Sequence, residues 1–283
     1  MSTYIYGIVG SRHPNLPDDV RETNAGDAGD AGSGANRANR ANRANGMDGM
    51  NGIGEPPLPV RVVRRGELAA LVSDAPGDLK PKQRDLLAHQ NVLSEAGLCG
   101  AVLPMRFGSL APDDDAVRTV LAERAEHYAE RLRALDSRVE YNVKASHNER
   151  AVLHQVLAEN PELRAMVEAN QLAGGGSHEQ KLRLGEKVAA TVRARESSDA
   201  DHVRRALEAT TEAVYAGPEG TGWLADLSFL VHRDAAVGFL SAVAELRADQ
   251  PHLDLRVRGP LPPYSFVESA GPSPAEGPTE PAG

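Results

Sequence analysis

The feature that most constrains this chain is the alternation of strand and helix patterns over residues 138–267. From 139 to 145, apolar and polar residues alternate, as in a strand with one buried face. A long helical pattern follows, and then a strand at 227–232, a helix at 235–248 and a strand at 253–258. Strands and helices that alternate over so short a length favour an open α+β sandwich of the ferredoxin-like kind.

The long helical pattern of this block predicts a hairpin of helices. Asn148 is a suitable N-cap for a helical region over 149–172, and three glycines at 174–176 form a turn. The helical pattern resumes at 178 and runs to 215, with Ser197-Ser198-Asp199 as a possible interruption. We therefore expect an antiparallel helical hairpin with coiled-coil character.

The first half of the chain carries a looser version of the same layers. In chain order, the patterns predict a strand at 4–9, a hairpin at 60–65 and 68–73, a helix at 81–96, a short strand at 101–106 and a helix at 113–136. A stripe of Leu86, Leu87, Gln90 and Leu93 is expected to face the core. The predicted fold class is α+β with two domains, each a sheet covered by helices, the second ferredoxin-like with a long helical hairpin.

Two segments of low complexity divide the chain. Residues 24–55 contain glycines and an Ala-Asn-Arg repeat with few bulky apolar side chains, so we expect a disordered insertion there. The alternative is a basic tether formed by the arginines of the repeat. A disordered tail is expected at 268–283. The predicted division is an N-terminal α+β domain over 1–110, a connecting helix over 111–137 and a C-terminal ferredoxin-like domain over 138–267.

Composition excludes several classes of protein. The chain has 40 Asp and Glu residues against 31 Lys and Arg, a formal net charge of −9, which argues against general nucleic-acid binding. No run approaches the roughly 18 apolar residues of a membrane span, and the N-terminus lacks the basic region of a secretory signal. A cytoplasmic protein is the simplest interpretation. The single cysteine, Cys99, is expected to be buried as a small apolar side chain.

No pattern in the sequence predicts catalysis. There is no nucleophile elbow and no phosphate-binding loop, and Cys99 has no base near it in sequence. His147 and His154 are seven residues apart, which is too far for one zinc ion without other ligands. We expect the histidines to be solvated or capping residues, and we expect no catalytic residue, no cofactor and no metal ion.

Two motifs do stand out. Residues 103–108 place Pro, Arg, Phe and Gly at the end of an apolar strand, which fits either a structural turn or an exposed docking edge. In the second motif, residues 259–267, prolines precede Tyr264 and Phe266, whose spacing predicts that both point to one face of a last strand. A proline-rich ligand for an aromatic groove is the alternative for this motif.

Four motifs occur in a characteristic order. They are Tyr4-Ile5-Tyr6-Gly7-Ile8, Leu103-Pro104-Met105-Arg106-Phe107-Gly108, Val139-Glu140-Tyr141-Asn142-Val143-Lys144 and Gly259-Pro260-Leu261-Pro262-Pro263-Tyr264-Ser265-Phe266. In this order and over nearly the whole chain, they resemble the gas vesicle GvpF/GvpL proteins. The low-complexity segment and the tail lie outside the resemblance.

The resemblance implies a fold and a function. The family fold has two α+β domains, with ferredoxin-like topology and a helical hairpin in the second. Members are non-enzymatic accessory proteins of cytoplasmic gas vesicles, without catalytic residue or cofactor. The implied partners are the shell protein GvpA and other gas vesicle accessory proteins, bound during nucleation or growth, and neither nucleic acid nor membrane.

A protein that shields an apolar shell subunit needs an exposed apolar patch or sheet edge. We expect this surface in the N-terminal half, because the strand at 4–9 and the motif at 103–108 are both apolar. The candidate interaction residues are Tyr4, Tyr6, Leu103, Met105, Arg106 and Phe107. The residues expected to shape the motifs are Gly108, Lys144, Gly259, Pro260, Pro263, Tyr264 and Phe266. The alternative functions are a small-molecule-sensing ferredoxin-like module and an enzyme of undetected type.

Overall fold

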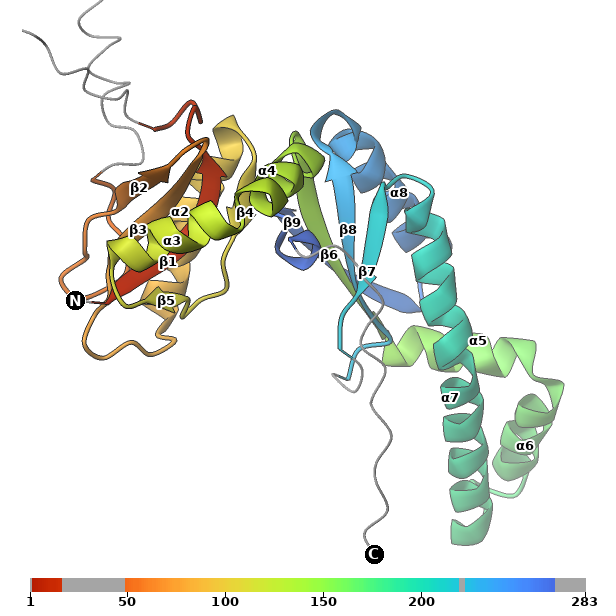
Figure 1. The fold of residues 1–283 in the computed structure, drawn as a ribbon. Coiled ribbons are helices and arrows are strands. Elements are labelled where there is room, and N and C mark those ends of the chain that lie inside the picture. Colours follow the sequence, from red (N-terminus) through yellow and green to blue (C-terminus); the bar gives the residue numbers. More distant parts are fainter. Residues whose placement is uncertain (1, 17–48, 219–221, 268–283) are drawn as a thin grey trace, which may run out of the picture. The chain divides into compact units, whose positions relative to one another are not determined.

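The computed structural model describes residues 2–16, 49–218 and 222–267, and the chain divides into two compact units (Figure 1). The first unit takes Met1–Arg138 and Leu261–Gly283, and the second takes Val139–Pro260. The region expected to connect two domains, 111–137, thus belongs to the first unit, as do the last residues of the predicted second domain. The expectations for 24–48 and 268–283 lie outside the described residues.

The sheet of the first unit has the strand order β2-β3-β1-β4, with β5 also paired to β1. Its strands are β1 (Thr3–Gly10), β2 (Arg61–Arg65), β3 (Leu68–Asp74), β4 (Val102–Pro104) and β5 (Leu110–Ala111). All the pairs are antiparallel, and β2 and β3 form the predicted hairpin. Because β1 pairs with β3 on one side and with β4 and β5 on the other, it is a central strand.

The helices of the first unit are α2 (Gln83–Cys99), α3 (Asp114–Glu123) and α4 (Ala125–Ala134). The helix predicted over 113–136 is two helices, because the backbone leaves helical geometry at Arg124. Helix α3 begins where the Asp113 carboxylate accepts a hydrogen bond from the Ala116 N–H at 2.8 Å.

The buried face of α2 differs from the predicted stripe. Its buried residues are Asp85, His89, Val92, Leu93 and Ala96. Leu86 and Leu87, which we expected in the core, are exposed. The helix is turned so that two polar side chains face inward, where they find hydrogen-bond partners.

Residues 49–55 are ordered in the first unit, contrary to the predicted extent of the disordered insertion. Ile53 is fully buried, and an isolated bridge pairs Asn51 with Pro59. One bulky apolar residue is enough to fix this segment, because its side chain fills the core beside Tyr6 and its N–H donates to the Tyr6 hydroxyl at 2.9 Å.

The second unit is a four-stranded sheet in the order β7-β8-β6-β9. Its strands are β6 (Arg138–His147), β7 (Ala213–Ala216), β8 (Ala225–His232) and β9 (Leu253–Leu261). The short strand β7 was not predicted, because its residues were counted as the end of the long helix. With β7, the element order is that of the ferredoxin-like fold, and the predicted class is confirmed.

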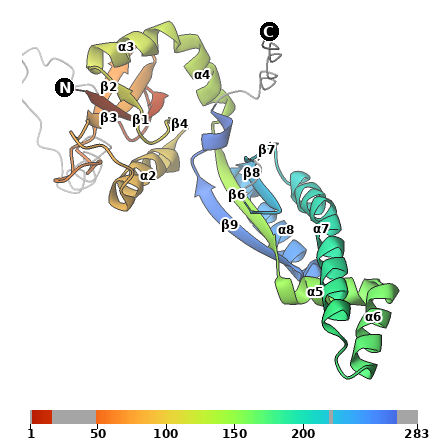
Figure 2. The same cartoon turned by 90° about the horizontal axis from the view of Figure 1, so that it is seen from below.

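The helices between β6 and β7 are α5 (Glu149–Glu159), α6 (Pro161–Leu172) and α7 (His178–Glu208). Asn148 caps α5 as predicted, and α7 passes through 197–199 without a break. The predicted helical hairpin is present (Figure 2), and it has its own small core. That core consists of Val152, Val156 and Leu163, packed against Leu157, Met166, Leu184, Val188 and Val192.

Helix α8 (Ala236–Asp249), preceded by η1 (Arg233–Ala235), and the C-terminal part of α7 cover one face of this sheet (Figure 2). The core between them contains Phe229 and Phe239, whose ring centroids are 5.4 Å apart. The same helices therefore fix the inward face of β6, β8 and β9.

Residues Tyr264–Phe266 form a short 3-10 helix, η2, and not the predicted strand with Tyr264 and Phe266 on one face. Tyr264 packs against the core that contains Tyr4, whereas the carbonyls of Phe266 and Val267 accept hydrogen bonds from Arg131 at 2.6 and 3.0 Å. The strand is impossible at this point because Pro262 and Pro263 have no N–H to donate to a ladder. The chain thus ends its described part inside the first unit.

Candidate functional site

The first and second motifs meet in a cluster of four rings in the core of the first unit. We call Tyr4, Tyr6, His89 and Phe107 the aromatic cluster. The rings of Tyr4 and Tyr6 meet edge to face at 4.9 Å, and Tyr4 contacts Phe107 at 5.8 Å. The His89 ring stacks on Tyr6 at 5.5 Å. These separations are those of favourable aromatic pairs.

Hydrogen bonds fix the rings of the aromatic cluster. His89 Nε2 lies 3.0 Å from the carbonyl oxygen of Met105, and only an N–H can donate to a carbonyl. His89 Nδ1 therefore accepts, and the Tyr4 hydroxyl donates to it at 2.8 Å. The Tyr4 oxygen also accepts from the Gly108 N–H at 3.4 Å. His89 and Tyr4 together thus tie strand β1 to both ends of the loop at 105–108.

A second set of hydrogen bonds holds residues 52–54 against this cluster. The Tyr6 hydroxyl accepts from the Ile53 N–H and, because Ser73 donates to the Asp74 carbonyl, donates to Ser73 Oγ at 3.0 Å. The carboxylate of Asp85 accepts from the Gly54 N–H at 3.0 Å. All polar groups of this part of the core are thereby paired.

Burial sets the protonation of the cluster. It lowers the pKa of His89 below its usual value, so the imidazole is neutral at neutral pH. Burial also raises the pKa values of Tyr4 and Tyr6. A neutral histidine thus lies between two protonated tyrosines at neutral pH.

The structure corrects the accessibility of the candidate interaction residues. Tyr4, Tyr6 and Leu103 are 0% exposed, so the folded unit offers them to no partner. Tyr4 and Tyr6 are buried because β1 is a central strand whose side chains pack in the core, and Leu103 of β4 pairs directly with Ile8 of that strand. Met105 and Phe107 are half-buried, and Arg106 is exposed.

Sequence reasoning missed the residues that join the motifs. His89 was counted among solvated or capping histidines, but His13, His89 and His252 are buried. The four-residue spacing of Asp85 and His89 on one helix face was the available signal. The expectation of a buried Cys99 was also wrong, because its side chain lies exposed at the end of α2.

Backbone geometry explains two glycines of the motifs. Gly108 has a φ of +92°, a conformation that other residues rarely adopt. Gly259 has a φ of +150°, and a Cβ atom there would lie 2.4 Å from Cδ1 of Tyr141. Gly259 precedes Pro260, so this junction of β9 depends on glycine for both dihedral angle and space.

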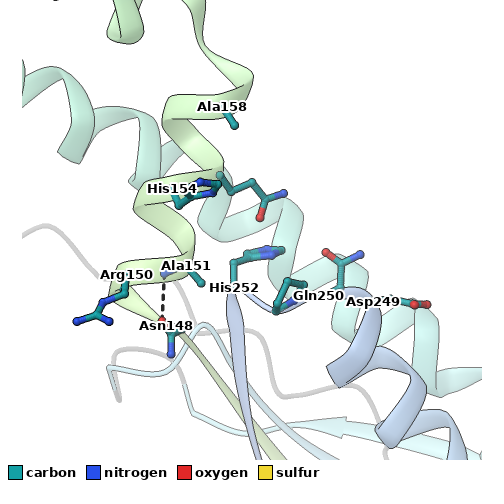
Figure 3. A pocket seen from close by; sticks show the side chains of 10 residues that line it. Asn148, Arg150, Ala151, His154, Ala158, Asp249, Gln250 and His252 are labelled. Atoms are coloured by element: carbon teal, nitrogen blue, oxygen red, sulfur yellow. Dashed lines mark hydrogen bonds between the residues drawn. The ribbon is translucent and has the colours of Figure 1, made fainter. Parts of the chain in front are cut away.

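The second unit holds a pocket of about 570 Å³ between α5 and the turn from α8 to β9 (Figure 3). It is lined by Asn148, Arg150, Ala151, His154, Gln155, Ala158, Asp249, Gln250, Pro251 and His252. His252 is 1% exposed, and its Nε2 lies 3.3 Å from Oδ2 of Asp199. Neither ring nitrogen has a hydrogen-bond partner among the described residues.

Asp199 behind this pocket is the centre of a charged network. It accepts from His147 Nε2 at 2.8 Å and lies 3.6 Å from Arg195 Nε. Burial alone would raise the pKa of Asp199, but the His147 hydrogen bond and the neighbouring charges of Arg195 and His252 outweigh it and lower the pKa. The network joins β6, α7 and β9.

The described residues offer neither a metal-ligating cluster nor a membrane-spanning helix. They contain no group of three or more His, Cys, Asp or Glu side chains arranged to hold a metal ion. Among the helices that the structure describes, none combines the length and the apolar character needed to cross a bilayer.

Comparison with known proteins identifies the family of this chain, which the geometry of the candidate site alone does not. The family model described as gas vesicle synthesis protein GvpL/GvpF matches residues 2–268. The chain belongs to the GvpL/GvpF family. This is a family of gas vesicle structural and accessory proteins and not a known enzyme family, so the protein has an accessory role in gas vesicles.

Two relatives in the GvpL/GvpF family come from Streptomyces sp. (strain CB03234). Gas vesicle protein F is 58% identical over 268 residues, which are 95% of this chain and 100% of the relative. Gas vesicle protein L is 29% identical over 245 residues, which are 76% of this chain and 84% of the relative.

Crystal structures show the same fold. The gas vesicle protein GvpF from Microcystis aeruginosa is 21% identical, with a TM-score of 0.61 over 94% of this chain and 99% of that one. GvpF from Anabaena sp. PCC7120 is 19% identical, with a TM-score of 0.64 over 95% and 99%. The GvpL/GvpF fold therefore extends over both units.

Proposed function

We propose that this protein acts without catalysis in the cytoplasm, where it binds the shell protein GvpA and other accessory proteins while gas vesicles nucleate or grow. The 58% identity to a gas vesicle protein F supports an F-type role. An accessory protein for a strongly apolar shell subunit needs an exposed apolar surface, and the first unit offers one.

The outward face of α2 is the observation that carries this proposal. Leu86 and Leu87 are exposed there, and Leu98 is 66% exposed three turns further along the same helix. Between Leu86 and Ser94 the sequence has no Asp, Glu, Lys or Arg, whereas Arg84 and Glu95 bracket this stretch. The exposed leucines thus lie on an uncharged surface that also carries Gln90 and Asn91, and exposed leucines with charged residues at the rim are typical of a protein–protein interface.

The loop of the second motif borders this face. His89, one turn from Leu86, donates to the Met105 carbonyl, and its ring lies 5.9 Å from that of Phe107. We therefore propose that Met105, Arg106 and Phe107 border the binding surface. The buried Tyr4, Tyr6 and Leu103 support this loop from the core side.

The test is capture of GvpA by the full chain and by the double variant Leu86→Gln, Leu87→Gln. We expect the variant to lose at least about tenfold in affinity, because two apolar side chains no longer leave water on binding. Both positions are exposed, so the fold should tolerate the change.

The matched control is Leu172→Gln with Leu182→Gln, which changes two exposed leucines of the second unit. If this control lost GvpA while the α2 variant kept it, the surface would lie in the second unit and the proposal would be wrong. Deletion of the gene, with electron microscopy of the cells, tests the accessory role itself. Normal vesicles in a strain without a paralogue would contradict that role.

One observation favours the alternative of a small-molecule sensor. The pocket between α5 and the α8–β9 turn has a volume within the range of ligand sites, with the buried His252 in its lining. A saturable rise in melting temperature with a metabolite, abolished by His154→Ala in the same pocket, would support it. GvpA capture is the primary proposal, because the family model for gas vesicle synthesis proteins matches nearly the whole chain.

A further inference from the structure

The sheet of the second unit has one face that no helix of the described part of this unit covers. Helices α7 and α8 lie together on the other side (Figures 1 and 2), where the core forms. The alternation of β6 places Asn142 and Lys144 on the uncovered face, and that of β9 places Arg256 and Arg258 there. An uncovered sheet face exposes whatever side chains alternate with the core.

Five side chains of this face define a surface that we call the Trp223 face: Lys144, Tyr215, Trp223, Arg256 and Arg258. Trp223, the single tryptophan of the chain, lies between two cations. The Lys144 Nζ is 5.5 Å from its ring centroid and the Arg256 guanidinium is 5.2 Å from it. Both distances are within the range of a cation–π contact.

The register of the strands brings these residues together. Strand β9 runs opposite to β6, because the His252 carbonyl accepts from the Asn148 N–H whereas Gly259 lies against Tyr141. This register places Arg256 opposite Lys144. On the other side, Tyr215 of β7 pairs with Ser228 of β8.

A hydrogen-bonded band joins the two sides of the face. The Asn142 amide donates to Ser228 Oγ at 3.3 Å and to the Asp226 carboxylate at 2.9 Å. The same carboxylate pairs with Lys144 at 2.8 Å, and these two contacts lower the pKa of Asp226 although burial would raise it. The face is therefore preorganised and not a set of independent side chains.

Of the three cations on this face, one is neutralised by a carboxylate and two are not. Asp226 neutralises Lys144, whereas Arg256 and Arg258 are exposed and have no carboxylate partner among the described residues. Asp254, at the start of β9, is an exposed acid of this face, and the alternation of β6 places the buried Glu140 on it as well. Trp, Tyr and Arg are also the residue types that most often dominate binding energy at protein interfaces. Here all three lie on one uncovered surface.

We propose that the Trp223 face binds an acidic segment of another protein, with Trp223 as the apolar anchor and Arg256 and Arg258 as the partners of its carboxylates. The two arginines without a carboxylate partner among the described residues complement the carboxylates of such a segment, and the Trp223 ring between Lys144 and Arg256 offers it an apolar contact. The nucleic-acid probe in the test below distinguishes this partner from a phosphate backbone. This surface is independent of the α2 face proposed for GvpA.

Because the chain has one tryptophan, its fluorescence reports on this face directly. The full chain is titrated with a synthetic peptide of four Glu-Ala-Leu-Glu repeats, with the same peptide carrying Gln for Glu, and with a 16-nucleotide oligouridylate. We expect a saturable fluorescence change with the acidic peptide alone, and an affinity that falls as salt is added.

The variant Arg256→Glu should weaken the acidic peptide at least about tenfold, because one of the two free cations becomes an anion. The control Arg193→Glu makes the same charge change on an exposed position of α7 and should leave binding unchanged. No saturable change with the acidic peptide, equal weakening by both variants, or tighter binding of the oligouridylate would each overturn the proposal. GvpA capture by the α2 face is measured separately, so failure of one proposal does not imply failure of the other.

Discussion

The hydroxyl of Tyr4 donates to Nδ1 of His89 across 85 residues of sequence, at 2.8 Å. We predict that Tyr4→Phe lowers the free energy of unfolding by about 1 kcal/mol, because the buried nitrogen loses its donor while the ring packing stays. Urea unfolding measures the change. Replacement of the exposed Tyr215 by Phe is the control, and an equal loss there would argue against a special role for the buried pair.

Acid should weaken the fold between about pH 7 and pH 5. Burial lowers the pKa values of His13 and His89, so the unfolded chain binds more protons than the folded chain in this range. Their contribution is fully present above the unfolded pKa of about 6.5 and is lost as pH falls, by at most about 1.4 kcal/mol per pH unit for each histidine. Urea unfolding at several pH values measures this slope.

His89→Gln should reduce that slope, because it removes one of the two histidines whose pKa values burial lowers. His127→Gln, at an exposed position, should leave the slope unchanged. A stability that is flat from pH 7 to pH 5 in the unaltered protein would contradict the assignment of both histidines as buried and neutral.

Gly259→Ala should destabilise the second unit by about 1–3 kcal/mol or more. The new Cβ would meet the Tyr141 ring and the Glu140 carbonyl, and the φ of +150° is strained for alanine. Gly185→Ala on α7 is the opposite control, since its Cβ meets nothing within 4 Å and alanine favours helix by up to about 1 kcal/mol. Thermal unfolding should show a lower melting temperature for Gly259→Ala and a higher one for Gly185→Ala.

Ile53→Ala should cost about 2–5 kcal/mol of stability, the usual range for removing a fully buried aliphatic side chain. Leu58→Ala, in the same segment and only half-buried, should cost less. A negligible effect of Ile53→Ala in urea unfolding would mean that residues 49–55 contribute little to the core.

Cys99 should react with a maleimide dye in the native protein, because its side chain is exposed. It is the single cysteine and follows Leu98 on α2, so the dye reports on the proposed GvpA surface. We expect its fluorescence to change saturably as GvpA is added to the full chain. A labelled protein that captures GvpA with no change at the dye would place the surface away from this end of α2.

The local sequence pattern was enough to predict strands whose residues alternate in polarity, such as β6. It also predicted helix N-caps that depend only on residues close in sequence, such as Asn148, which accepts from the Ala151 N–H. It failed where a residue depends on a distant partner. Asp85 and His89 are buried because Gly54, Tyr4 and Met105 supply their hydrogen bonds, and no local pattern contains that information. Leu86 and Leu87 were consequently placed on the wrong face.

The remaining differences have similar causes. Strand β7 is only four residues long and closely follows a helix. Its extended conformation is therefore decided by its pairing with β8, and its own sequence does not indicate it. The interaction residues were chosen for apolar character, but Tyr4 and Tyr6 of the central strand β1 and Leu103 of the neighbouring β4 are buried. The surfaces now proposed come from side chains that the folded structure leaves exposed.

The return of residues 261–267 to the first unit has a consequence for biosynthesis. The first unit is discontinuous, and the second is in effect inserted within it. Tyr264 and the carbonyls held by Arg131 complete the first unit only after residues 139–260 have been synthesised. The ferredoxin-like unit, which is continuous in sequence, can therefore finish folding first, although it is the later of the two to begin emerging.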